Sequence, residues 1–284
     1  MINTILFPSS YFGTNKVDED LQAEYDAVVR TGLFDVIIFG YEDWFSKGKI
    51  TLSKIPVERT VAIHRGWMMK PEQYERFYNI LLDNNIELVT SPKDYVSMHV
   101  FPNVYEFVKD DTAKMMVFPL HEDLPCDVLQ REFSKFMIKD YVKSVKGTDF
   151  PKYFDAKVRQ EELNRWMEVF YKYRGNLLTG GICVKEYLDL KRYGNKVNEF
   201  RVFYINHMVA TVSRNSGQTN MAMNPPKELL EKYSELPSIY YTVDYAELSD
   251  GTWRVIEAGD GSVSGLSENQ DYEAYYRALY TCFR

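Results

Sequence analysis

The sequence predicts an α/β domain over residues 1–112 followed by an α+β domain over residues 113–284. The chain has 284 residues, which is enough for two domains of ordinary size. In the first part, short apolar runs alternate with helical patterns, as in an open α/β layer. In the second part, β-type runs follow one another through short connections, which indicates antiparallel sheets with a helix packed on one face.

The first domain is expected to contain buried strands and amphipathic helices. The helical pattern over residues 17–30 has acidic residues in its first turn and is ended by Gly32. The pattern over residues 71–82 begins with a proline and has apolar residues at spacings of three and four. The polar segment 109–113 predicts a linker. The expected strands are residues 5–7, 36–39, 60–63 and 86–89.

The second domain is expected to contain one long helix and several strands. The amphipathic pattern over residues 157–173 predicts the helix. Two residues, Asn206 and His207, join two apolar runs, and Asp250-Gly251 is a second hairpin signal because this pair tolerates positive φ. The expected strands are residues 115–118, 135–142, 182–190, 199–205, 208–213, 239–248 and 252–257.

Composition excludes several classes of protein. Acidic residues number 41 and basic residues 34, so the net charge of −7 argues against a protein that coats nucleic acid or an anionic membrane. The apolar runs fall short of the roughly 20 residues that span a bilayer, and the N-terminus lacks a signal-peptide pattern. The three scattered cysteines predict neither a disulfide framework nor a zinc site. We therefore expect a soluble, cytoplasmic protein.

Two lysines, Lys139 and Lys143, lie four residues apart in a β-type run and are expected on one face of a strand. Two ammonium groups on an apolar face repel each other unless an anion lies beside them, and lysine is a common ligand of polyphosphate. The alternative is an edge strand with two ordinary surface lysines.

Three acidic residues near the C-terminus form a second candidate site. Asp244 and Glu257 lie on the two arms of the Asp-Gly hairpin, and Asp260 follows in a turn-rich segment. Carboxylates held close together favour a cation, and hard oxygen ligands suit Mg²⁺. The alternative is a salt bridge to Arg254 or a lysine, or simple exposure to solvent.

A third set follows the long helix. Glu186 and Asp189 lie where a strand changes sheets, a position suited to binding ribose hydroxyls. Arg201, between Phe200 and Val202, is expected to project from a buried strand and to bind phosphate or carboxylate. The alternative for Arg201 is a structural ion pair with Glu199 or Asp244.

The order of these motifs is more specific than any one of them. The chain has paired lysines, a helix, a Glu-x-Leu hinge, Glu-Phe-Arg on a strand, and then Val-Asp followed by Ile-Glu-x-Gly-Asp-Gly. In this order the chain resembles the ATP-grasp superfamily, and within it the bacterial and phage ATP-grasp proteins akin to cell-division-cycle-123-like proteins. The resemblance covers about residues 115–284, and the segments 5–10 and 65–69 resemble the N-terminal domain of that group.

The resemblance implies two bound cofactors, ATP and Mg²⁺, and assigns residues to each. The superfamily usually ends its metal motif with Glu-x-Asn, whereas this chain has Glu257-Ala-Gly-Asp260, so Asp260 is the least secure ligand. The implied roles are phosphate binding by Lys139 and Lys143, adenine binding by Glu186, Tyr187 and Leu188, ribose binding by Asp189, γ-phosphate or acyl-phosphate binding by Arg201, and Mg²⁺ binding by Asp244, Glu257 and Asp260.

Candidate contacts for the remaining substrate are two arginines. Arg65 follows a strand, where open α/β sheets place ligands. Arg214 lies in a polar, turn-like segment after a strand and is a second candidate for phosphate or acid recognition, so that Arg201, Lys143 and Arg214 form the expected catalytic set. The isolated histidines are interpreted as structural residues.

The predicted function is an ATP- and Mg²⁺-dependent ligase that activates a carboxylate as an acyl phosphate for attack by an amine or similar nucleophile. The expected partners are ATP and an acid and amine pair, which includes peptides and proteins as candidates, and no membrane. One alternative is an ATP-binding assembly factor or chaperone for a protein partner. Another is ATP-dependent modification of a nucleic-acid end, which the net charge disfavours but a basic groove around Lys139, Lys143, Lys146 and Lys152 allows.

Overall fold

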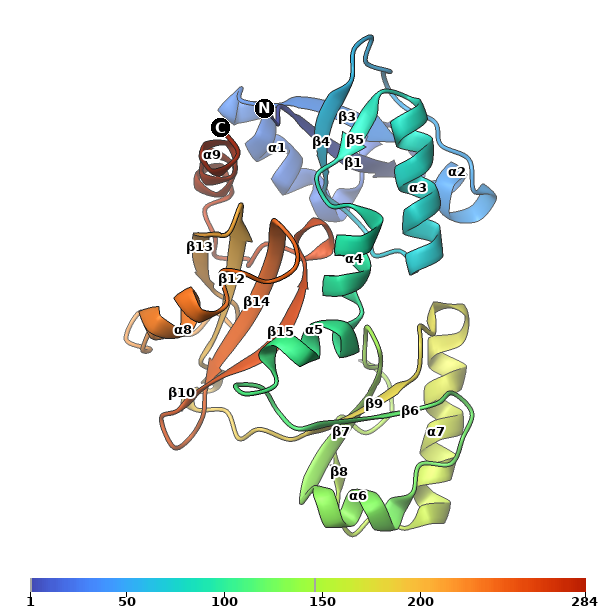
Figure 1. Cartoon of the computed structure of the whole chain (residues 1–284), viewed down its shortest axis with the longest axis vertical. Coiled ribbons are helices and arrows are strands. Elements are labelled where there is room, and N and C mark those ends of the chain that lie inside the picture. Colours follow the sequence, from blue (N-terminus) through green and yellow to red (C-terminus); the bar gives the residue numbers. More distant parts are fainter. Residues whose placement is uncertain (1, 146) are drawn as a thin grey trace.

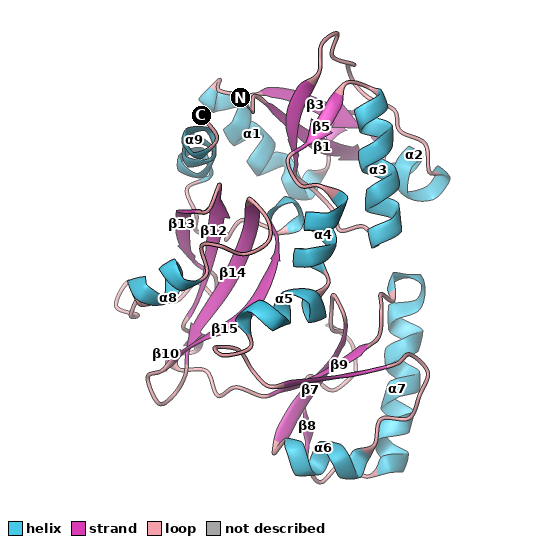
Figure 2. Ribbon diagram, in the orientation of Figure 1, coloured by secondary structure: helices cyan, strands magenta, loops and turns pink. Residues whose placement is uncertain are grey.

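The computed structural model describes residues 2–145 and 147–284 of the chain. Lys146, expected in the basic groove, lies outside the described residues. Figures 1 and 2 show three sheets of the described residues stacked along the long axis of the molecule, each with its own helices. Among the described helices, none is both long and apolar enough to cross a membrane.

The N-terminal sheet is mainly parallel. Strand β1 is central and pairs in parallel with β3 and β4, β5 adds to β4, and the short β2 pairs antiparallel with β1. The expected strands and helices are present, and Gly32 ends α1 in the left-handed conformation (φ 64°). The elements are β1 (Thr4–Ser10), β2 (Gly13–Val17), α1 (Gln22–Thr31), β3 (Asp35–Phe39), α2 (Tyr41–Lys47), β4 (Thr60–His64), α3 (Pro71–Asp83) and β5 (Ile86–Leu88).

The second sheet is antiparallel and has the strand order β6-β9-β7-β8. Helices α6 and α7 cover it, and their apolar residues Leu129, Leu163 and Phe170 share a core with Phe136 and Val184 of the strands. The elements are β6 (Met115–Phe118), α6 (Cys126–Glu132), β7 (Lys135–Asp140), β8 (Phe154–Asp155), α7 (Gln160–Arg174) and β9 (Ile182–Glu186).

The third sheet is antiparallel with the order β13-β12-β14-β15. The predicted two-residue turn between β12 and β13 is confirmed, since Asn206 and His207 both have positive φ (50° and 62°). The elements are β10 (Arg192–Tyr193), β11 (Lys196–Val197), β12 (Glu199–Ile205), β13 (Met208–Arg214), α8 (Lys227–Lys232), β14 (Tyr240–Glu247), β15 (Trp253–Asp260) and α9 (Tyr272–Cys282).

Helices α4 (Pro92–His99) and α5 (Phe101–Val108) precede the expected boundary at residue 112 but pack on the third sheet. Phe101 and Val104 lie in one apolar core with Tyr204 and Val243 of that sheet. Apolar burial, rather than the polar composition of segment 109–113, therefore decides which layer these helices join.

The C-terminal helix α9 returns to the N-terminal domain. Tyr275 and Leu279 of α9 share a core with Ala27 and Val28 of α1, and the two chain ends lie near each other in Figure 1. The N-terminal domain is thus packed against both ends of the remaining chain, through α4 and through α9.

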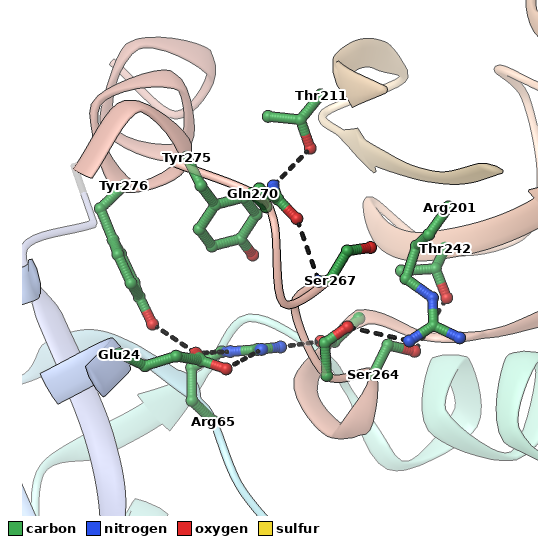
Figure 3. A network of polar contacts seen from close by, with 12 residues as sticks. Glu24, Arg65, Arg201, Thr211, Thr242, Ser264, Ser267, Gln270, Tyr275 and Tyr276 are labelled. Atoms are coloured by element: carbon green, nitrogen blue, oxygen red, sulfur yellow. Dashed lines mark hydrogen bonds and ion pairs between the residues drawn. The ribbon is translucent and has the colours of Figure 1, made fainter. Parts of the chain in front are cut away.

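The structure corrects the role expected for Arg65. Its side chain is only 2% exposed, and its guanidinium donates to both carboxylate oxygens of Glu24 at 2.9 Å (Figure 3). It also donates to the Tyr240 hydroxyl (3.3 Å) and to the Gly261 carbonyl oxygen. Arg65 therefore joins the N-terminal domain to the third sheet and is not exposed to a substrate.

We expect Glu24→Gln to lower the free energy of unfolding by about 3 kcal/mol, because the Arg65 guanidinium stays buried without its counter-charge. Urea denaturation measures this difference. Glu87→Gln is the matched control, since Glu87 pairs with Arg59 in an exposed pair and its loss costs less than about 1 kcal/mol. Equal effects of the two substitutions would contradict the structural role of Arg65.

Candidate functional site

A deep cleft separates the second sheet from the third. It holds a cavity of about 660 Å³, within the range of pockets that enclose small molecules. Both sheets and the segment that joins them, residues 187–190, line it. Of the residues predicted to bind nucleotide, Lys139, Lys143, Tyr187, Leu188 and Asp189 line this cavity.

One end of the cleft is aromatic. Strand β9 ends at Glu186, and Tyr187 follows in extended backbone, its N–H donating to the Lys135 carbonyl oxygen at 2.9 Å. The Tyr187 ring meets Tyr153 edge-on (centroids 4.8 Å apart), and the Lys135 Nζ lies 4.0 Å from the Tyr187 ring centroid. The strand predicted over residues 182–190 is therefore shorter, and its end leaves backbone groups along the cleft.

Glu186 differs from the prediction. Its carboxylate accepts a hydrogen bond from the Lys114 backbone N–H at 3.2 Å, and the residue does not line the cavity. Alternation along β9 explains this, because Lys185 faces the cleft and its neighbour Glu186 faces away. The side chain of Glu186 is thus directed away from the cavity that Tyr187 and Leu188 line.

Lys139 and Lys143 are not on one strand face, contrary to the prediction. Strand β7 ends at Asp140, whose Oδ1 accepts the backbone N–H groups of Val142 (2.8 Å) and Lys143 (2.7 Å). This side chain replaces a ladder partner and turns the chain. The buried Asp140 carboxylate is balanced by Arg174 at 2.7 Å. Lys143 reaches the cavity from the turn, and Lys139 from the strand.

Lys185 is a cleft residue that the sequence interpretation missed. The register pairs Met137 with Lys185 and Lys139 with Cys183, so the two lysines share one sheet face. The Lys185 Nζ donates to the Ile256 carbonyl oxygen at 2.7 Å and lies 4.1 Å from the Phe101 ring centroid. Burial and the neighbouring Lys139 lower the pKa of Lys185 to about 7. The available signal was its place two residues before Tyr187 in a predicted strand.

Asp244 and Glu257 oppose each other on β14 and β15. Arg201, opposite Asp244 on β12, donates to both Asp244 oxygens at 2.8 and 2.7 Å, which is the ion pair named as its alternative. The Glu257 carboxylate accepts from the Lys139 Nζ at 3.1 Å across the cleft. Desolvation raises the pKa of Glu257, but the charge and hydrogen bond of Lys139 outweigh it and bring the pKa to about 2.

The segment after β15 closes the site beside Arg201. The guanidinium also donates to the Gly265 carbonyl oxygen at 2.9 Å, and the Ser264 hydroxyl hydrogen-bonds to Thr242 at 2.8 Å (Figure 3). With Lys143 and Glu257, these residues line a second, smaller cavity of about 250 Å³. Cations and carboxylates thus alternate around a space that adjoins the nucleotide-sized cavity.

Asp260 is a correction to the predicted metal set. The residue borders the small cavity, but it lies three positions after Glu257 on the same strand and opposes Tyr241, so alternation directs its side chain to the other face. There the carboxylate is fully buried and accepts from the Ser262 N–H at 2.9 Å. Within the described residues, no group of three or more His, Cys, Asp or Glu side chains is placed to hold a metal ion.

Asp244 and Glu257 fit a magnesium ion that shares its coordination with phosphate. Mg²⁺ is usually bound in phosphate sites by one or two carboxylates, with water and phosphate oxygens completing the shell. These two carboxylates face the same small cavity as Arg201 and Lys143. The position two residues after Glu257, where the family motif has asparagine, is Gly259 and offers no side-chain ligand.

Arg214 does not lie with Arg201. The register pairs Arg214 with Phe200 and Ser213 with Arg201, which places the two arginines on opposite faces of the sheet. The Arg214 guanidinium lies over the Phe200 ring, 5.6 Å from its centroid, and Arg214 lines neither the nucleotide-sized cavity nor the small one. The expected shared catalytic role with Arg201 and Lys143 is therefore corrected.

A family model for an ATP-grasp domain, the third family of its clade, matches residues 125–279. The chain belongs to this ATP-grasp family. The match covers both sheets of the cleft and α9, so the predicted fold class is confirmed. The narrower resemblance to cell-division-cycle-123-like proteins is not shown by this match and stays a prediction.

Solved structures of ATP-grasp ligases share the fold along nearly the whole chain. PsnB in complex with a minimal precursor has 11% identity and a TM-score of 0.62, covering 99% of this chain and 100% of that one. The D-cycloserine synthetase DcsG has 12% identity and a TM-score of 0.64, with 99% and 100% covered. D-alanyl-alanine synthetase A from Vibrio cholerae O1 biovar eltor str. N16961 has 10% identity and a TM-score of 0.59, with 99% and 98% covered.

One further structure of PsnB contains a phosphomimetic variant of the minimal precursor, Mg and ADP. It has 13% identity to this chain and a TM-score of 0.61, with 100% of both chains covered. No curated protein matches the sequence significantly.

The burial of Asp260 predicts a pH dependence of stability. Burial raises its pKa to about 7, so the folded protein holds a proton there that the unfolded chain releases at lower pH. The free energy of unfolding therefore falls as the pH rises toward 7 and through it, by about 1.4 kcal/mol between pH 6 and pH 8. Asp260→Asn removes this contribution, and urea denaturation at both pH values measures it. An unchanged pH dependence in the variant would contradict the assignment.

Proposed function

We propose that the protein is an ATP- and Mg²⁺-dependent ligase that joins a carboxylate to an amine or similar nucleophile. The observation that carries the proposal is the arrangement of charges across the cleft. Lys139 and Lys185 on the second sheet face Asp244 and Glu257 on the third, beside a cavity of nucleotide size. Membership of the ATP-grasp family and the shared fold with ATP-grasp ligases support it.

The cleft suits a nucleotide from end to end. The extended backbone at Tyr187 and Leu188 offers donors and acceptors for an adenine edge, and Asp189 follows where a ribose hydroxyl is expected. Lys139, Lys143 and Lys185 supply positive charge where the phosphates extend toward the third sheet. Bound Mg²⁺, held by Asp244 and Glu257, neutralises phosphate charge.

Carboxylate activation requires charge stabilisation rather than a protein nucleophile. Phosphoryl transfer from ATP to a carboxylate oxygen spreads negative charge over the transferred group, which fixed cations stabilise. Arg201, held by Asp244 and Gly265, is rigidly placed beside the small cavity for this purpose. The nucleophile then attacks the acyl carbon of the acyl phosphate, the amide bond forms, and phosphate departs.

We expect Lys139→Ala to weaken nucleotide binding. At a ligand concentration 100 times the dissociation constant, Mg-ADP stabilises a protein by about 2.7 kcal/mol, and a tenfold loss of affinity removes about 1.4 kcal/mol of that. Thermal or urea denaturation with and without Mg-ADP measures the difference. Lys93→Ala, at an exposed position on α4, is the matched control and should leave the stabilisation unchanged.

Glu257→Gln should reduce the dependence of ADP binding on Mg²⁺ and leave the metal-free affinity nearly unchanged, because it removes one charged ligand with little change in shape. Release of ADP from Mg-ATP with candidate acid and amine pairs then tests ligation itself. If Mg-ADP fails to stabilise the protein, the proposal is wrong. Nucleotide binding without stimulated turnover would favour the ATP-dependent binding of a protein partner.

A further inference from the structure

A third cavity, of about 840 Å³, lies between the N-terminal domain and the second sheet. It is lined on one side by α2, α3 and residues 67–70, and on the other by residues 142–143 and 174–179. His99 and Lys143 line both this cavity and the small cavity that contains Arg201 and Glu257. A ligand in the third cavity is therefore adjacent to the position proposed for phosphoryl transfer.

The side of the cavity formed by the N-terminal domain is aromatic. Tyr41 and Phe45 have ring centroids 4.6 Å apart, and the Trp67 indole is held by a hydrogen bond from its Nε1 to the Asp18 carboxylate at 2.9 Å. Trp67 is still 37% exposed, and Met68 lies beside it in the lining. Aromatic rings that are fixed in place yet exposed to a cavity suit a flat or bulky apolar group of a ligand.

The charges of the cavity favour an anionic group. Its lining contains the cations Lys70, Arg76, Lys143 and Arg174 and the single acid Glu72. Asp140 neutralises Arg174, and Arg76 donates to the Gly48 carbonyl oxygen at 2.8 Å. Lys70 is exposed and makes no ion pair with the described part of the chain, so a carboxylate of the ligand is its natural partner.

His99 is held at the boundary of the two cavities by stacked rings. Its imidazole stacks on Tyr95 (centroids 4.6 Å), which stacks on Tyr74 (3.8 Å, 4° between planes). The Tyr95 hydroxyl accepts from the Met69 N–H and donates to the Met69 carbonyl oxygen, which holds the stack in place. Within residues 2–145 and 147–284, no side chain or backbone group hydrogen-bonds to the His99 ring nitrogens, so a neutral imidazole there can accept from a ligand N–H.

We propose that this third cavity binds the nucleophilic co-substrate, and that this co-substrate is an amino-acid-derived amine with an aromatic side chain and a carboxylate. The aromatic group lies against Trp67, Tyr41 and Phe45, and the carboxylate pairs with Lys70. The amine lies at His99, facing the small cavity. The proposal rests on the proposed ligase function and names its acceptor class, which is met by a free aromatic amino acid or by a peptide with an N-terminal aromatic residue.

Calorimetric titration of the full-length protein loaded with Mg-ADP tests the proposal. The probes are the dipeptide Phe-Gly, the free amino acid phenylalanine, and three dipeptides that each lack one feature: Ala-Gly, Phe-Gly amide and N-acetyl-Phe-Gly. We expect Phe-Gly or phenylalanine to bind at least about tenfold more tightly than each analogue that lacks a feature. Tighter binding of Phe-Gly than of phenylalanine identifies a peptide acceptor, and the reverse order identifies a free amino acid.

Two pairs of variants locate the binding. Trp67→Ala and Lys70→Glu should each weaken binding of the better probe by about tenfold or more, since a truncated aromatic contact or a reversed charge removes a main contact. Phe12→Ala and Lys93→Glu are the matched controls, because both residues are exposed and neither lines the cavity. Variants that retain Mg-ADP binding establish that the fold is intact.

The outcomes separate this proposal from the proposed function. Failure of Mg-ADP to bind in the first titration would contradict the nucleotide site itself. If Mg-ADP binds but neither aromatic probe does, or if Trp67→Ala leaves binding of the better probe unchanged, the acceptor assignment is overturned and the ligase proposal stands. Equal binding of the analogues without an aromatic ring, a carboxylate or an amine would overturn it in the same way.

Discussion

Two carboxylates that oppose each other across the β14–β15 ladder determine how the cleft is built. Like charges about 4 Å apart repel by about 4 kcal/mol at an effective dielectric constant of about 20, so each needs a compensating cation. Asp244 obtains it from Arg201 in the same sheet, and Glu257 from Lys139 of the opposite sheet. The second pair joins the two sides of the cleft, which makes the ionic balance of the metal-binding residues part of the packing between sheets.

The same balance explains how the cleft is ready for a charged ligand. Phosphate groups and Mg²⁺ bring both signs of charge, so each existing ion pair can exchange its partner without leaving a charge bare. Lys185, with its pKa lowered to about 7 by burial and by Lys139, gains most from a phosphate nearby. The buried pair Arg65–Glu24 has the opposite character, since it is enclosed by Tyr240 and Tyr276 and serves only to join domains.

Local sequence signals predicted the strands, the hairpin at Asn206-His207 and the nucleotide-binding hinge, because each depends on a few adjacent residues. They failed where a side chain competed with the backbone, as when Asp140 ended β7 and placed Lys143 in a turn. They also failed for Arg65, whose position after a strand is compatible with either a ligand contact or a buried ion pair. Glu24, its partner, is 41 residues away and carries no signal of the pairing.

The sequence by itself determined the order of motifs, and with it the ATP-grasp fold and the candidate residues Lys139, Arg201, Asp244 and Glu257. Only the tertiary structure decided which way each side chain faces. Alternation along the strands separates Asp260 from Glu257 and Arg214 from Arg201, and it brings Lys185 beside Lys139. The reason is physical: a side chain's direction depends on the register between strands, and register is set by pairing between residues far apart in the chain.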